Sequence, residues 1–196
     1  MNKKMIGFIV GRILLLEAGL MILPLLISFI YKETSLHKIS YFLVITILVI
    51  LGFLFSGKTP DNTQIQGKEG FIIVSLSWIL LSAFGAIPFV ITKEIPSFID
   101  AFFEVVSGFT TTGSSIITDL SKLSHSNLFW RSFTHFVGGM GVLVLVLAIF
   151  PKNSPSSIHV MKAEVSGPTF GKLVSKLSTT ARVLYQIYLV MTIIVM

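Results

Sequence analysis

Long apolar segments constrain the fold of this chain more than any other feature. Five can be drawn, over residues 5–31, 39–55, 71–91, 132–150 and 183–196. A helix needs about 20 apolar residues to span the hydrocarbon core of a bilayer, with about 17 as a lower limit, so the second segment is just long enough and the fifth falls short. Hydrophobic residues make up 53% of the chain and charged residues only 12%, which excludes a soluble globular domain. The sequence therefore predicts an all-α integral membrane protein.

The distribution of basic residues predicts the orientation. Loops rich in Lys and Arg stay in the cytoplasm, and with a cytoplasmic N-terminus nine such residues lie in inside loops and five in outside loops. The inside residues are Lys3, Lys4, Lys58, Lys68, Lys152, Lys162, Lys172, Lys176 and Arg182, and the outside residues are Lys32, Lys38, Lys93, Lys122 and Arg131. We therefore expect a multi-pass protein with its N-terminus inside. The net charge of +6 is explained by these basic residues, which set the orientation in the membrane. No nucleic-acid partner is therefore expected.

The apolar stretch over residues 97–109 is too short to cross a membrane. As a helix it would be about 20 Å long, against about 30 Å of hydrocarbon. Pro96 and Ser97 are typical of a helix start, and Gly108 is a stop signal. Irregular backbone at membrane depth is tolerated only where it is buried in protein or lines a wet cavity. We expect a re-entrant half-helix that Gly108 ends, followed by a returning loop.

The polar loop after this half-helix, Thr110-Thr111-Thr112-Gly113, suits a monovalent cation. Backbone carbonyls can replace the hydration shell of such an ion. Gly113 can adopt a positive φ and leaves room for neighbouring carbonyls to turn inward. The negative end of the preceding helix dipole also favours a cation. The loop taken alone fits a polar outer turn equally well.

Three stretches resemble a known family. Residues 101–115 (AFFEVVSGFTTTGSS), 129–142 (FWRSFTHFVGGMGV) and 161–168 (MKAEVSGP) are similar to the first pore repeat, and to the segment that follows it, of bacterial Trk/Ktr-type potassium uptake proteins. The similarity is greatest to the TrkH-like members. That family builds its pore from four repeats of span, half-helix and span in one polypeptide, and each repeat contributes one filter strand.

The resemblance implies a division of the chain. Residues 1–56 would form two additional N-terminal helices and residues 57–70 a cytoplasmic loop. Residues 71–150 would be the first pore repeat, with its pore helix at 97–109 and its filter at 110–114. Residues 151–182 would be a second cytoplasmic loop and 183–196 the start of the second repeat. Because the chain stops inside an apolar run, we expect it to be the front part of a longer protein.

The resemblance also implies a function and partners. Thr110, Thr111, Thr112 and Gly113 would form this repeat's share of the potassium filter, with Thr111 and Thr112 as the main carbonyl donors. The protein would take up potassium across the bacterial cytoplasmic (inner) membrane without a cofactor. The full-length protein would be a homodimer. It would bind a cytosolic, nucleotide-binding, TrkA-like regulatory ring, and the 151–182 loop would help make this contact. The alternative is a truncated or accessory membrane subunit that does not conduct.

Charged residues within the apolar segments have several interpretations. Glu104 could pair with Arg131 or with His135, which share a helix face, and so anchor the pore helix; with Asp100 it could instead attract cations to the outer mouth. Glu17 is expected to find a partner on a neighbouring helix. The histidines lack metal-ligand spacing, and no nucleophile accompanies the carboxylates, so we expect no enzyme.

Overall fold

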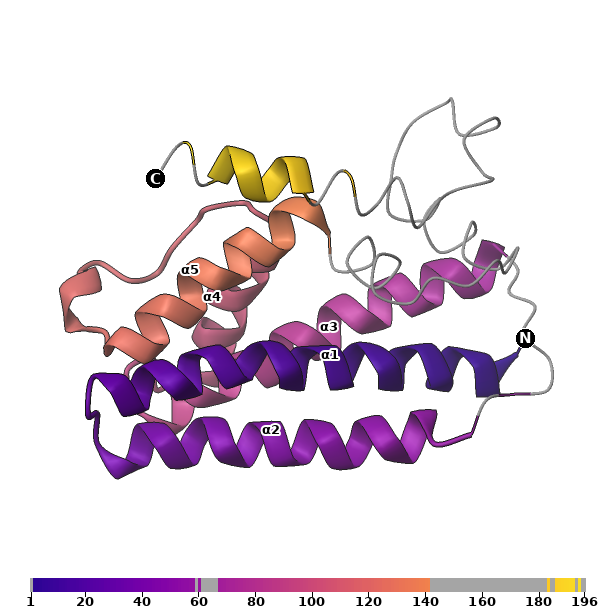
Figure 1. Ribbon diagram of the computed structural model, residues 1–196, viewed down its shortest axis with the longest axis horizontal. Helices are drawn as coiled ribbons and strands as arrows, with labels where there is room; N and C mark the ends of the chain where they lie inside the picture. The colour runs from indigo at the N-terminus through magenta and orange to yellow at the C-terminus, as the bar shows by residue number, and fades with distance from the viewer. Residues whose placement is uncertain are drawn as a thin grey trace.

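The computed structural model describes residues 2–58, 60, 67–141, 183, 186–192 and 194, and the regular structure in these ranges is helical. In chain order the elements are α1 (Lys3–Ile30), α2 (Ser35–Ser56), α3 (Gly67–Ile91), α4 (Phe98–Phe109), the 3₁₀ helix η1 (Leu120–Lys122) and α5 (His125–Met140), as Figure 1 shows. The cytoplasmic loop expected at 151–182, residues 59 and 61–66 of the loop expected at 57–70, and the end of the fourth span at 142–150 lie outside the described residues.

Helices α1, α2 and α3 are long and apolar enough to cross a membrane, with 28, 22 and 25 residues. They confirm the first three predicted spans, but each begins two to four residues earlier than the apolar segments do. The reason is that polar residues form their first turns or caps. The Asn2 side chain, for example, accepts a hydrogen bond from the backbone N–H of Met5, as an N-cap does.

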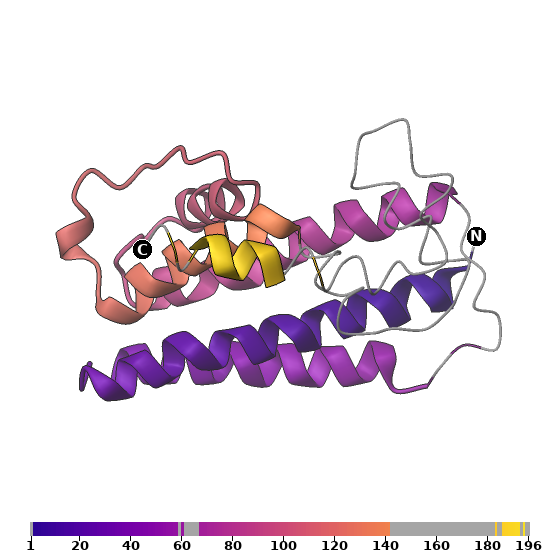
Figure 2. The same ribbon diagram turned by 45° about the horizontal axis from the view of Figure 1, so that its top comes forward.

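Helices α1 and α2 form an antiparallel hairpin with close backbone contact. A Cβ added at Gly52 would lie 2.5 Å from Leu15 Cγ, and one added at Gly11 would lie 2.9 Å from the carbonyl oxygen of Gly52. Figures 1 and 2 show the two helices side by side along most of their length. Small residues allow this approach between membrane helices.

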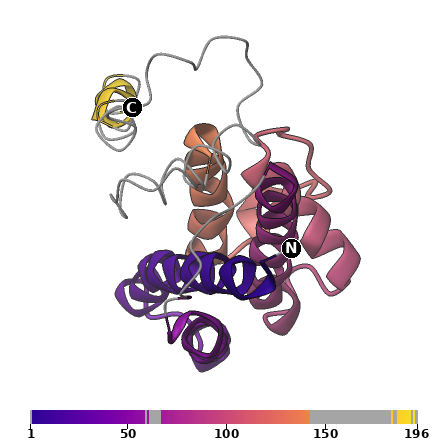
Figure 3. The ribbon, with the colours of Figure 1, turned by 90° about the vertical axis from the view of Figure 1, so that its right-hand side faces the viewer.

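Helices α3, α4 and α5 form a second group beside the hairpin, as the end-on view shows (Figure 3). Trp130 of α5 is fully buried between these helices. Its indole N–H donates to the carbonyl oxygen of Gly85 at 3.0 Å, and its ring meets that of Phe109 edge-on with centroids 6.2 Å apart. This tryptophan therefore joins α5 to α3 and to the end of α4.

Contacts between elements occur at both ends of the bundle. At one end, the backbone N–H of Asn2 donates to the carboxylate of Glu69 at the start of α3. At the other end, Glu33 from the α1–α2 turn and Glu94 from the α3–α4 turn both contact the start of α5. The two turns and the beginning of α5 thus lie together.

The predicted start of the fourth span, residue 132, is wrong, because α5 begins seven residues earlier at His125. The first turn, His125-Ser126-Asn127, is polar and so escapes a hydropathy window. Ser126 and Asn127 are nevertheless fully buried, since partners from other elements satisfy their polar groups.

Candidate cation site at the end of the short helix

Helix α4 is a half-length helix with 12 residues. At about 1.5 Å per residue it is about 18 Å long, which is too short to cross about 30 Å of hydrocarbon. It begins after Ser97, whose hydroxyl accepts a hydrogen bond from the backbone N–H of Asp100 at 3.4 Å. The start therefore agrees with the predicted pore helix within one residue.

The helix ends at residue 109, as predicted, but the stop signal assigned to Gly108 is wrong. Gly108 is helical, and a Cβ there would lie 2.1 Å from Thr134 Oγ1 of α5, so this glycine permits helix packing instead of ending the helix. The helix ends through backbone bonds from Thr112 N–H to Ser107 O and from Thr111 N–H to Gly108 O, both 2.9 Å. These two bonds form a Schellman motif.

Thr111 occupies the position in this motif that glycine usually takes, with φ +55°. A β-branched residue in the left-handed region is strained, and such strain concentrates at functional sites. Gly113, two residues on, has φ +77°, the positive φ predicted from its identity. The loop therefore enters the left-handed region twice between Thr111 and Gly113.

The carbonyl oxygens of Thr110, Thr111, Thr112 and Gly113 accept no hydrogen bond from the described part of the chain, and all four residues are exposed. The next carbonyl, that of Ser114, accepts from Ser107 Oγ at 2.6 Å. The loop is thus bonded to α4 at both ends, while four consecutive carbonyl oxygens remain available between these bonds. Such an arrangement can offer several oxygens to a dehydrated cation.

Glu104 joins the far end of this loop to α5. Its carboxylate accepts hydrogen bonds from Arg131 Nε at 2.6 Å, from Ser115 Oγ at 2.9 Å and from the backbone N–H of Ile116 at 3.0 Å. The side chains of Glu104 and Arg131 are only 1% and 16% exposed. Of the two partners considered for Glu104, the structure places Arg131 in contact, whereas His135 Nδ1 donates to the carbonyl oxygen of Arg131 at 3.0 Å.

Sequence reasoning missed the contributions of Ser107 and Ser115. Ser107 bonds to Ser114, seven residues further on, and Ser115 bonds to Glu104, eleven residues before it. The sequence does not reveal the geometry of the turns that bring these residues together. Their one signal in the sequence is membership in the polar stretch.

Two other carboxylates lie apart from the loop's carbonyls. Asp100 is exposed on the first turn of α4. Asp119 accepts hydrogen bonds from the hydroxyl and the backbone N–H of Ser121, and these bonds lower the pKa of the Asp119 carboxyl. Within the described ranges, no three His, Asp or Glu side chains come together as a metal site.

Glu17 lies fully buried in α1, and neither of its carboxyl oxygens has a hydrogen-bond partner in the part of the chain that the structure describes. The partner expected on a neighbouring helix is therefore not found there. Glu17 is separate from the site built on α4.

Three bilayer-length helices packed with a half-length helix, which ends in an exposed polar loop, define an integral membrane protein that is helical in its described part. Residues 35–196 match the family model described as TrkH, cation transport protein. The chain belongs to this family.

Individual relatives agree with this assignment. The chain is 35% identical over 195 residues to the Trk system potassium uptake protein TrkH of Salmonella typhimurium, and 34% identical over 189 residues to the Trk system potassium uptake protein TrkG of Escherichia coli. These matches cover 98% and 95% of this chain but only 40% and 39% of the relatives. The crystal structure of the potassium transporter TrkH from Vibrio parahaemolyticus matches with a TM-score of 0.76 and 32% identity, over 98% of this chain and 38% of that one.

Proposed function

We propose that this chain contributes one filter loop to a potassium-uptake pore, with Thr110, Thr111, Thr112 and Gly113 supplying carbonyl ligands. The observation that carries the proposal is a row of four exposed residues whose carbonyl oxygens accept no hydrogen bond from the described residues. Partial desolvation of K⁺ needs replacement oxygens at close range, and backbone carbonyls provide them without adding a fixed charge. The relatives are named as potassium uptake proteins, which agrees with this choice of ion.

The electrostatics of α4 favour a cation at the same place. The loop follows the C-terminal end of α4, where the helix dipole is negative. Arg131, the cation that supports the end of the loop, is itself paired with Glu104 at 2.6 Å. Arg131 therefore stabilises the loop's support without placing an unpaired positive charge beside the carbonyls.

The proposed setting is the cytoplasmic membrane of a bacterium, with the N-terminus inside. The nine-to-five balance of basic residues supports this orientation. In it, the Asn2 end of the bundle faces the cytoplasm, and the end with the α1–α2 and α3–α4 turns faces outward. Helix α4 would then re-enter from the outer side and present its C-terminal loop to ions arriving from outside.

The proposed partners are a cytosolic nucleotide-binding ring of the TrkA type and a second copy of the full-length protein. The relatives are named as parts of a Trk system, which supports a multi-component assembly. The basic 151–182 loop, with Lys162 and Glu164, is the segment proposed to meet the ring. Pull-down of the ring protein by wild type, and its loss when this loop is replaced by a neutral linker, would test that contact.

Potassium-dependent growth tests the main proposal. The complete coding sequence is expressed in a bacterial strain that lacks potassium uptake, as wild type, Gly113→Ser and the control Gly19→Ala. Because Gly113 has φ +77°, whereas a Cβ added at Gly19 meets nothing within 4 Å, we expect only Gly113→Ser to lose growth at low potassium and K⁺-over-Na⁺ selectivity, by about tenfold.

Unchanged uptake and selectivity in Gly113→Ser would contradict the assignment of this loop as part of the filter. Wild type that reaches the membrane but moves no potassium, alone or with its ring partner, would instead support the non-conducting accessory subunit.

A further inference from the structure

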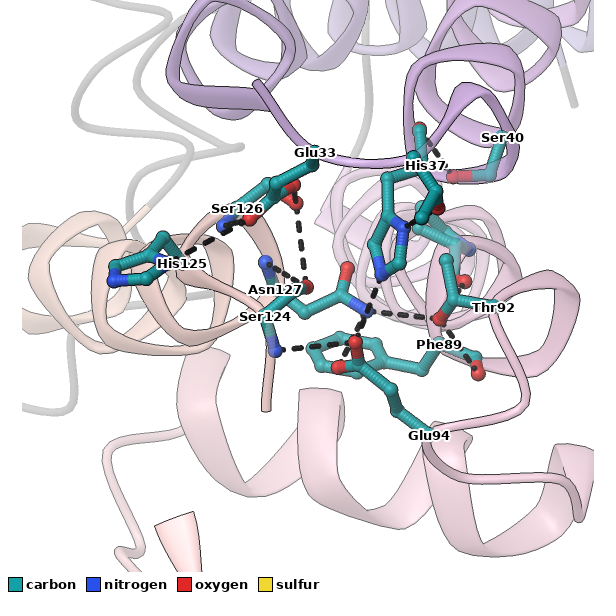
Figure 4. Close-up of polar contacts among 12 residues, drawn as sticks. Glu33, His37, Ser40, Phe89, Thr92, Glu94, Ser124, His125, Ser126 and Asn127 are labelled. Carbon is teal, nitrogen blue, oxygen red and sulfur yellow. Dashed lines mark hydrogen bonds and ion pairs between the residues drawn. The ribbon is translucent and has the colours of Figure 1, made fainter. Parts of the chain in front are cut away.

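A polar cluster surrounds the beginning of α5 at the end of the bundle away from Asn2. Figure 4 shows side chains from three separate parts of the chain meeting there. They come from the α1–α2 turn and the start of α2, from the α3–α4 connection, and from the first turn of α5. The members with contacts between these parts, or with the first turn of α5, are Glu33, His37, Tyr41, Glu94, Ser124, Ser126 and Asn127. None of them belongs to the loop proposed as the filter.

Two glutamates from distant segments bind the backbone of the first turn of α5. Glu94 Oε1 accepts from the Ser124 N–H at 3.1 Å, and Glu33 Oε1 accepts from the Ser126 N–H at 3.0 Å. Glu33 Oε2 also accepts from the Ser126 hydroxyl at 2.5 Å. The first N–H groups of a helix lack intrahelical partners, and the helix dipole favours negative charge there. The two carboxylates thus neutralise the positive end of α5.

The two glutamates bind the start of α5 in addition to its local N-cap residue. Ser124 already serves as N-cap, because its hydroxyl accepts from the Asn127 N–H at 3.3 Å. The two glutamates are 93 and 30 residues away from the groups that they accept from, and their side chains are only 8% and 13% exposed. They therefore fix where the helix begins relative to the rest of the bundle.

A second layer holds the glutamates and Asn127 in place. The Asn127 amide donates to Glu94 Oε2 at 2.8 Å, and its oxygen accepts from the Tyr41 hydroxyl at 2.7 Å. His37 Nε2 lies 2.9 Å from Glu94 Oε1. Tyr41 and Asn127 are fully buried. Through these contacts, α2 and the α1–α2 turn reach α5 directly.

The position of α5 matters because α5 supports the loop. Arg131, five residues after Ser126, binds Glu104, which in turn binds Ser115 and Ile116 at the end of the loop. A Cβ on Gly108 would collide with Thr134 Oγ1 at 2.1 Å, so α5 also lies directly against the end of α4. A shift of the start of α5 would therefore move Arg131 and Thr134 together.

We infer that Glu33 and Glu94 are positioning residues for the filter: they hold the outer end of α5 so that Arg131 meets Glu104 and the loop keeps its conformation. The α1–α2 hairpin then supports the pore repeat, in addition to any contact it makes with lipid. For its transport readout the inference rests on the function proposed above.

The test compares Glu33→Gln and Glu94→Gln with the control Asp119→Asn, in the protein expressed from its complete coding sequence. Each variant removes one carboxylate charge, but Asp119 is 46% exposed and bonds only to Ser121 and Lys122 of its own turn within the described residues. Ser126→Ala is a milder variant that keeps the backbone bond to Glu33. Readouts are the K⁺-to-Na⁺ uptake ratio per folded molecule, and the rate at which the thiol added by Ile117→Cys in each variant reacts with an impermeant thiol reagent. These 196 residues contain no native cysteine.

We expect Glu33→Gln and Glu94→Gln to lower the uptake ratio at least threefold and to raise the thiol reaction rate severalfold, with Ser126→Ala intermediate and Asp119→Asn like wild type. A merely structural role would lower the amount of folded protein and leave both quantities per molecule unchanged, and that result would overturn the inference. If wild type moves no potassium, the proposed function fails, and the thiol rate alone decides whether the glutamates position the loop.

Discussion

Among the described residues, Thr111 has the backbone conformation most unusual for its side chain. Its φ of +55° places a β-branched residue in the left-handed region, which costs an L-residue about 1–2 kcal/mol. Bonds from Thr111 and Thr112 to the carbonyls of Gly108 and Ser107 maintain this conformation. Strain of this kind at the start of the loop is consistent with a site whose geometry is under selection for a ligand.

Replacing Thr111 by glycine tests the strain directly. Glycine removes the steric cost but adds chain entropy to the unfolded state, worth about 0.5–1 kcal/mol, so we expect Thr111→Gly to raise the free energy of unfolding by about 0.5 kcal/mol. Thr112→Gly is the matched control, because Thr112 has a negative φ and should lose about 0.5–1 kcal/mol. Denaturation in detergent measures both changes. Equal losses in the two variants would show that Thr111 is unstrained.

Glu17 offers a second test on a single residue. Both carboxyl oxygens are buried without a partner within the described ranges, and a buried polar group without a hydrogen bond costs about 1–3 kcal/mol. Glu17→Met, of similar length, should therefore raise the melting temperature in detergent, and Glu17→Gln should not. A lower melting temperature for Glu17→Met would reveal a partner supplied from outside the described residues.

Helices α4 and α5 approach each other most closely at Gly108 of α4 and Gly138 of α5. A Cβ at Gly138 would lie 2.2 Å from the carbonyl oxygen of Phe109, the last residue of α4. The clash is with backbone, which cannot turn aside as a flexible side chain can. The end of α4, and with it the start of the loop, is therefore set by the surface of α5.

Gly138→Ala should separate the two helices. We expect a loss of about 2–3 kcal/mol in unfolding free energy, the usual result of overpacking, together with weaker potassium selectivity. Gly19→Ala is the control, since it has open space around it and should gain up to about 1 kcal/mol from helix propensity. The same unfolding free energies in the two variants would contradict a close α4–α5 contact at this glycine.

An element could be predicted from the sequence when its formation depends on local composition, and not when it depends on residues far away in the sequence. Hydropathy predicted α1, α2 and α3, because burial in lipid depends on local composition alone. It misplaced the start of α5, because Ser126 and Asn127 are buried by partners 33 to 93 residues away. Likewise Gly108 resembles a helix stop, yet its role is set by Thr134, which the sequence does not place beside it.

At the scale of the whole molecule, the position of the polar loop after the short helix and the pairing of Glu104 with Arg131 were predictable, and the other bonds that hold the loop were not. The residue types of Thr110 to Gly113 and the family resemblance pointed to the loop, and Gly113 has the positive φ that its identity suggested. The bonds from Glu104 to Ser115 and Ile116, and the two glutamates at α5, depend on tertiary geometry. The chain spans about two fifths of the length of its relatives.

We propose that potassium binds the carbonyl oxygens of Thr110 to Gly113. The most direct measurement is the structure of the full-length protein in thallium(I), a strongly scattering substitute for K⁺, with sodium-only crystals as the reference. We expect anomalous density within coordination distance of the Thr111 and Thr112 carbonyls that excess K⁺ removes and Na⁺ does not. Density elsewhere in the pore with none at these carbonyls would contradict the claim.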